Sequence, residues 1–269
     1  MNKTYVRSLN NNQYKLLTAI YSFRFSTRLL LSEYCGVPNN TSFYSRLQIL
    51  QKHEYIAARY DKAYRLAGRE AEFYLLPKGL RALRDAGLLE VSDTIQKALY
   101  KDKTVGEDFI KHQVQLMRIR NKLVSTHKDL QIFTTRDIQA LDYFPKPRPD
   151  LFLSMKKGED VIRCFLEYVP AGAITSKLRK RLEYLTRYYE EDDWSDTETP
   201  FPAVLFVAET KLVEASLRKL IAREQYHSDV DIAYYTATQK SILEMPTDDL
   251  AIWADATDAD NLFRLADIT

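Results

Sequence analysis

Residues 36–50 have the sequence GVPNNTSFYSRLQIL, a turn followed by an amphipathic helix. Gly36 and Pro38 favour the turn, and Asn39 or Asn40 can cap the helix. Apolar residues then follow at i, i+4 and i+7, so they share one helix face. They are Phe43, Leu47 and Leu50. The other face is polar, and the segment therefore predicts a helix that packs on a core through one side only.

Further expected elements flank this helix on both sides. The patterns predict helices over residues 12–21 and 26–36, extended segments over 55–60 and 71–76, and another helix over 80–88. Ser26 is the expected N-cap of the second helix. An order of helix, helix, turn, helix and hairpin is typical of a winged helix-turn-helix, and we expect residues 1–90 to form this fold.

A winged helix-turn-helix places its third helix in the major groove of DNA, whose width an α-helix fits. Hydroxyl side chains and one arginine on the polar face can contact phosphates or bases. The hairpin tip, residues 61–69, is basic and can neutralise phosphates. The predicted DNA-contacting residues are Thr41, Ser42, Ser45, Arg46, Arg59, Lys62, Arg65 and Arg69. The alternative is a winged helix that contacts protein and carries an ordinary solvated charged surface.

The composition is that of a globular protein with an uneven distribution of charge. The 269 residues have a net charge of +2. Residues 1–140 contain 23 basic and 13 acidic residues (+10), and residues 141–269 contain 16 and 24 (−8), which favours an anion-binding N-terminal part. Cys35 and Cys164 are too few for a disulfide framework or a four-cysteine zinc site. With no apolar run of about 18 residues and no signal peptide, we expect a cytoplasmic protein without a membrane span.

The sequence pattern changes after residue 90. Residues 91–106 show weak periodicity and are the expected linker, and residues 107–269 are the expected second domain. The predicted helices of this domain cover residues 107–125, 176–189 and 211–223. The predicted strands cover residues 131–135, 150–155, 161–168, 203–208 and 230–235. Hairpin strands followed by a strand–helix–strand crossover predict an α/β domain with a mixed sheet, so the chain as a whole is expected to be α+β.

Two acidic residues lie at neighbouring strand ends in this domain. Asp150 begins one strand, Glu167 lies near the end of the next, and a hairpin that turns near Gly158 brings them together. Paired carboxylates suit Mg²⁺, which can activate water for attack on a phosphate. The alternative is that Asp150 is a strand-edge residue and Glu167 a structural ion-pair partner.

This constellation resembles the PD-(D/E)XK nuclease fold, whose motif is Asp at a strand start with Glu and Lys flanking one residue on the adjacent strand. Asp150 and Glu167 match the two acids, whereas Val169 occupies the lysine position. In degenerate members a cation from the next helix takes over, which makes Lys177 or Lys180 the candidate. The resemblance therefore implies a catalytic site of these acids and lysines, with Asp150 and Glu167 as Mg²⁺ ligands.

The chain as a whole resembles the replication-relaxation family of plasmids and other mobile elements, over about residues 12–225. The segments that carry the resemblance are LLPKGLRAL, KHQVQLMRIRNKL, RPDLFL, FLEY, KLRKRLEYLTRYY and FPAVLFVAE. It implies a DNA-binding protein of plasmid replication, mobilisation or conjugative transfer with a nuclease-like second domain. Double-stranded DNA is the implied partner, and a homodimer and other replication or transfer proteins are further candidate partners.

Two other functions fit the same sequence. One is an active Mg²⁺-dependent DNA endonuclease, and the other is a transcriptional regulator whose second domain dimerises or binds a partner. A relaxase of the common type is disfavoured because the four histidines are not closely spaced. ATP hydrolysis is disfavoured because the phosphate-loop motif GxxxxGK[ST] is missing.

Overall fold

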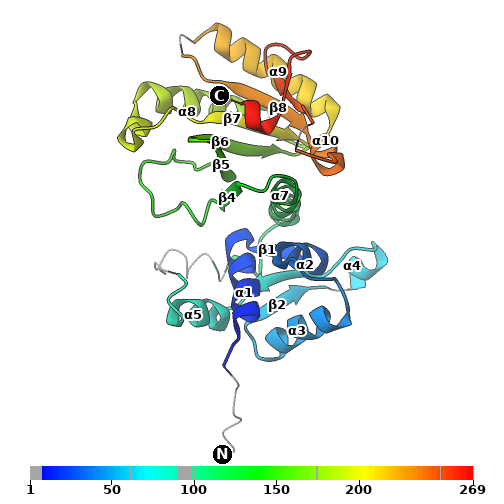
Figure 1. The fold of residues 1–269 in the computed structure, drawn as a ribbon. Coiled ribbons are helices and arrows are strands. Elements are labelled where there is room, and N and C mark those ends of the chain that lie inside the picture. Colours follow the sequence, from blue (N-terminus) through cyan, green and yellow to red (C-terminus); the bar gives the residue numbers. More distant parts are fainter. Residues whose placement is uncertain are drawn as a thin grey trace, which may run out of the picture. The chain divides into compact units, whose positions relative to one another are not determined.

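A computed structural model describes residues 8–60, 62–89, 99, 101–173, 175–228, 230–248 and 250–268. The protein is an α+β molecule that divides into two compact units, residues 1–118 and 119–269 (Figure 1). The division falls inside one helix, α7 (Glu107–Thr126). Most of the predicted linker lies outside the described residues, and the predicted domain boundaries stay a prediction. Of the helices that the structure describes, none combines the length and the apolar character needed to cross a bilayer.

The first unit combines helices with a three-stranded antiparallel sheet. Its helices are α1 (Asn11–Phe23), α2 (Arg28–Cys35), α3 (Thr41–Lys52), α4 (Lys62–Leu66) and α5 (Pro77–Asp85), followed by the start of α7. Its strands are β1 (Phe25–Thr27), β2 (Ile56–Arg59) and β3 (Glu72–Leu75), in the order β1-β3-β2. The order of α1, α2, α3, β2, β3 and α5 along the chain is the predicted one.

Side-chain caps fix where the first three helices begin. Asn10 caps α1, and Asn40 caps α3 by accepting a hydrogen bond from the backbone N–H of Phe43 at 3.0 Å. The cap of α2 is Thr27, not the predicted Ser26. Ser26 is instead buried in β1, because this short strand pairs with β3 just before the helix begins.

The segment between β2 and β3 differs from the predicted hairpin tip because it contains the short helix α4. The Tyr64 ring is buried, and its hydroxyl donates a hydrogen bond of 2.7 Å to the Glu72 carboxylate. Burial, together with Glu72, raises the pKa of Tyr64, so the hydroxyl keeps its proton and stays a donor. One buried tyrosine therefore anchors the segment to β3.

The second unit is built on a seven-stranded mixed sheet in the order β10-β9-β8-β7-β6-β5-β4. The strands are β4 (Leu130–Thr134), β5 (Leu151–Lys157), β6 (Asp160–Val169), β7 (Ala203–Ala208), β8 (Tyr234–Thr238), β9 (Trp253–Asp255) and β10 (Leu262–Phe263). The helices are α8 (Thr175–Glu190), η1 (Asp193–Thr197), α9 (Lys211–Tyr226), α10 (Gln239–Glu244) and η2 (Leu265–Asp267). The β6-β7 and β7-β8 pairs are parallel and the others are antiparallel, which agrees with the predicted mixed sheet.

The core of this unit lies between the sheet and the helices α8 and α9, which cover the same face (Figure 1). Strand residues that point to this face include Phe165, Val169, Val204 and Phe206. They pack with the helix residues Leu182, Leu185, Leu217 and Ile221. β7 is buried along its whole length, as its continuous apolar sequence predicts.

The C-terminal part of the sheet differs from the prediction. The expected strand over residues 230–235 lies further along the chain, as β8, and β9 and β10 extend the sheet beyond it. β8 is buried although it contains two threonines, because each hydroxyl has a partner. Thr236 donates to the Glu214 carboxylate at 3.2 Å, and Thr238 caps α10.

The two cysteines lie in different units. Cys35 is half-buried at the end of α2, Cys164 is buried in β6, and neither forms a disulfide. Burial raises the pKa of the Cys164 thiol to about 12, so this side chain stays protonated at neutral pH.

Candidate functional site

The helix α3 presents a polar surface away from the core of the first unit. Phe43, Leu47 and Leu50 are buried on its inner side. Thr41, Ser42 and Ser45 are exposed, and Arg46 is half-buried. The structure therefore places all four predicted α3 contacts on one element and leaves the three hydroxyl side chains open to solvent.

A groove of about 430 Å³ runs beside α3 in the same unit. Its lining includes Arg28 of α2, Tyr44 and Gln51 of α3, and Tyr60 and Arg69 from the segment between β2 and β3. The Arg28 guanidinium lies over the Tyr44 ring at 5.4 Å from its centroid. Sequence patterns missed this groove because its lining comes from α2, α3, β2, β3 and the segment between the two strands.

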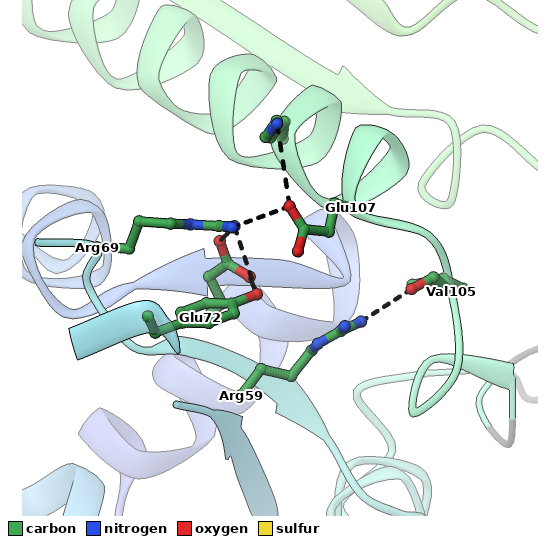
Figure 2. Close-up of polar contacts among 7 residues, drawn as sticks. Arg59, Arg69, Glu72, Val105 and Glu107 are labelled. Carbon is green, nitrogen blue, oxygen red and sulfur yellow. Dashed lines mark hydrogen bonds and ion pairs between the residues drawn. The ribbon is translucent and has the colours of Figure 1, made fainter. Parts of the chain in front are cut away.

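The four predicted cations around the strand connection divide into two pairs. Arg59 donates a hydrogen bond of 2.8 Å to the Val105 carbonyl, and Arg69 forms ion pairs of 2.9 Å with Glu72 and 3.0 Å with Glu107 (Figure 2). These two arginines thus hold the chain just before α7, and the first turn of α7, against the sheet of the first unit.

The other two cations of this set are exposed. Lys62 lies at the start of α4, and the Arg65 guanidinium lies 5.7 Å from the centroid of the Tyr60 ring. Both side chains are therefore accessible at the surface, where a phosphate can reach them.

In the second unit, Asp150 and Glu167 lie side by side as the hairpin register predicts. Leu151 pairs with Leu166, and continuing this register by one residue places Asp150, just before β5, next to Glu167. One Asp150 carboxylate oxygen accepts a hydrogen bond of 2.9 Å from the backbone N–H of Tyr168.

Arg181 of α8 contacts Glu167 of this carboxylate pair. One Glu167 oxygen accepts hydrogen bonds from both Nε, at 2.9 Å, and Nη2 of Arg181. The third guanidinium nitrogen donates to the Pro147 carbonyl at 2.6 Å. Only 11% of the Arg181 side chain and 15% of the Glu167 side chain are exposed. This is the ion-pair arrangement that the sequence left open as the alternative for Glu167.

The carboxylate pair does not fit a Mg²⁺ ion as it stands. The guanidinium that neutralises Glu167 would oppose a divalent cation at the same oxygen. Within the described residues, no group of three or more His, Cys, Asp or Glu side chains is arranged to hold a metal. We derive no hydrolytic step from this geometry, and the assignment of Asp150 and Glu167 as Mg²⁺ ligands stays a prediction.

Lys177 and Lys180 lie on the exposed side of α8. They line an open hollow of about 560 Å³, together with Pro147, Arg181, Glu183, Tyr184 and Arg187. Neither carboxylate of the Asp150–Glu167 pair lines this hollow. The catalytic role predicted for the two lysines therefore stays a prediction.

Comparison with known proteins does not assign a family. No protein-family model and no curated protein matches this chain. Among solved structures, the chain is similar to the restriction endonuclease FokI bound to DNA, with a TM-score of 0.29 and 9% sequence identity. The match covers 90% of this chain and 45% of FokI, so the chain spans less than half of its neighbour. A likeness at this TM-score carries no argument about fold or function.

Proposed function

We propose that the protein binds double-stranded DNA through its first unit, which is a winged helix-turn-helix with α3 in the major groove. The observation that carries this proposal is the exposed polar face of α3 beside a groove whose lining includes Arg28, Tyr44 and Tyr60. Hydroxyl groups on such a face can donate to phosphates and to base edges. The order of elements and the three-stranded sheet support the proposal as well.

The charge of the first unit favours a polyanionic partner. Residues 1–118 contain 19 Lys and Arg and 11 Asp and Glu, a net charge of +8. Lys62 and Arg65 contact the DNA backbone in this proposal, because they are exposed beside the strand connection. Arg59 and Arg69 stabilise the unit instead, through their contacts with Val105, Glu72 and Glu107.

Substitutions at the start of α3 test this proposal. Thr41→Asp/Ser42→Asp places two carboxylates where phosphates would lie, while acidic residues in a first helical turn leave the helix stable. Like charges at an interface cost several kcal/mol, so the Kd for duplex DNA should rise at least about tenfold, as measured by fluorescence anisotropy. Ser216→Asp, on an exposed position of α9, is the control for an added carboxylate outside α3. Equal affinity in the three proteins would exclude α3 as the contact.

We further propose that the DNA target belongs to a plasmid or mobile element, in replication, mobilisation or conjugative transfer. The sequence resemblance to the replication-relaxation family supports this role, and a homodimer and other replication or transfer proteins are its candidate partners. Selection of bound sequences from a random duplex library should yield one enriched motif. A library that shows no enrichment would contradict an origin-binding or promoter-binding role.

A Mg²⁺-dependent endonuclease is the second candidate that the sequence left open, and its metal would have to displace Arg181 from Glu167. Nicking of supercoiled plasmid that needs Mg²⁺ and disappears in Asp150→Ala would support it. Nicking that is unchanged in this variant would come from a contaminant. If the wild-type protein binds DNA without cleaving it, the result favours a transcriptional regulator. In that hypothesis the second unit dimerises or binds a partner.

A further inference from the structure

The geometry points to a second phosphate-binding site, on the exposed face of α8 in the second unit. Its ligand is the phosphodiester backbone of a nucleic acid, held by Lys177, Lys180 and Arg187. These residues line the hollow of about 560 Å³ that lies between α8 and Pro147. The site goes beyond the proposed function, because it lies in the other unit and needs no contact from α3.

Three cations at this hollow are not neutralised by an ion pair among the residues that the structure describes. Lys177, Lys180 and Arg187 are exposed, and no ion pair joins any of them to a carboxylate within the described parts of the chain. Arg181 is different, because Glu167 already neutralises its guanidinium. Glu183 is the one acidic side chain in the lining, so three uncompensated cations face a single carboxylate.

The spacing of these residues suits a repeating anion. Positions 177, 180, 184 and 187 lie at i, i+3, i+7 and i+10, which places them on one helix face. With a rise of 1.5 Å per residue the stripe is about 15 Å long, and the phosphates of one DNA strand follow at about 3.4 Å along the duplex axis. The stripe is therefore long enough to contact several successive phosphates.

The wall opposite these cations is fixed in place. The Tyr184 hydroxyl accepts a hydrogen bond of 2.7 Å from the backbone N–H of Lys146, which ties the loop to α8. Arg148 braces the same loop by donating to the Ile138 carbonyl at 3.1 Å and the Leu141 carbonyl at 3.1 Å. A preformed wall lowers the entropy that a ligand loses on binding.

The basic stripe is a local feature of its unit. Residues 119–269 contain 20 Lys and Arg and 26 Asp and Glu, a net charge of −6. An unspecific attraction to polyanions is therefore not expected from this unit as a whole, and binding depends on the α8 face.

The test measures DNA binding by the full chain as a function of salt. Lys177→Gln/Lys180→Gln/Arg187→Gln removes the three cations, and Lys211→Gln/Lys219→Gln/Arg223→Gln removes the same charge from exposed positions of α9. Anisotropy titrations use random duplex and single-stranded oligonucleotides between 50 and 200 mM KCl. Three phosphate contacts account for about 40-fold in affinity over this fourfold change in salt, so the α8 variant should lose that much salt dependence.

The outcomes separate this site from the one on α3. A smaller salt dependence in the α8 variant alone supports the site, and the oligonucleotide that shows it identifies the form bound. Equal salt dependence of the affinity in the α8 variant and the wild type would overturn the proposed site. A loss of salt dependence in the α9 control as large as that in the α8 variant would overturn it as well. Repeating the series with Thr41→Asp/Ser42→Asp shows whether α3 contributes, so either site can fail while the other stands. Urea midpoints of all variants confirm that they fold.

Discussion

Arg181 occupies a position on α8 that faces the core side of the helix. Leu178 lies three residues before it, Leu182 follows it directly, and Leu185 lies four residues after it. The Arg181 side chain is largely buried, so its charge needs an acidic partner, which Glu167 supplies from β6. The pair therefore follows from the phase of the helix as much as from the strand register.

Removing the acid from this pair should destabilise the protein. Glu167→Gln leaves Arg181 largely buried without its counter-charge, and we expect a loss of about 2–3 kcal/mol in the free energy of unfolding. Urea denaturation measures it, with Glu183→Gln on the exposed side of α8 as a control expected to stay within about 0.5 kcal/mol. A Glu167→Gln protein as stable as the wild type would show that the pair contributes no net stability.

At the scale of the element, α3 depends on one capping side chain. Asn40 satisfies the backbone N–H of Phe43, and its neighbour Asn39 makes no such contact in the helix start as described. The cap keeps the first turn of α3, which carries Thr41 and Ser42, in helical conformation.

The two asparagines provide a direct comparison. Asn40→Ala should lower the free energy of unfolding by about 1 kcal/mol, because one N–H at the helix start loses its partner. Asn39→Ala, one residue earlier and exposed, should change it by less than about 0.5 kcal/mol. Thermal or urea unfolding of both variants checks this, and equal losses would contradict the role of Asn40 as the cap.

The elements also show what the sequence could and could not predict. The turn and stripe of α3, the β5-β6 hairpin and the buried β7 follow from local periodicity, and all are present. β1 was not predicted because three residues are too few to show a period. The phase of α8 indicates which of its cations lies toward Glu167. The contacts of Arg59 with Val105 and of Arg69 with Glu107 show no such sequence signal, since they span 46 and 38 residues.

At the scale of the whole molecule, buried ionisable groups in the second unit determine its response to alkaline pH. The pKa of Cys164 is raised to about 12, and burial raises the pKa of Tyr188 and Tyr234 as well. Each group loses its proton more readily when the unit unfolds, because water then stabilises the anion. Alkali therefore favours the unfolded state of this unit.

The expected pH dependence has a definite sign. Between about pH 9 and pH 12 the unfolded Cys164 is ionised and the folded one is not, so unfolding free energy should fall by about 1.4 kcal/mol per pH unit. The two tyrosines add to the fall above about pH 10. Urea unfolding at pH 8, 9 and 10 measures how the unfolding free energy falls with pH. The Cys164→Ala variant should lose the part of this fall that occurs between pH 8.5 and 10. An unfolding free energy of the wild type that does not change between pH 8 and pH 10 would contradict this expectation.

The placement of the two cysteines has one more consequence. Since each unit contains a single thiol, alkylation followed by mass spectrometry reports on the units separately in the unmodified protein. Cys164 is buried, so it reacts only when the structure around it opens, and its labelling rate, divided by that of an unstructured thiol, gives the equilibrium constant for that opening. Adding DNA during labelling would then show directly whether a nucleic acid holds the second unit closed.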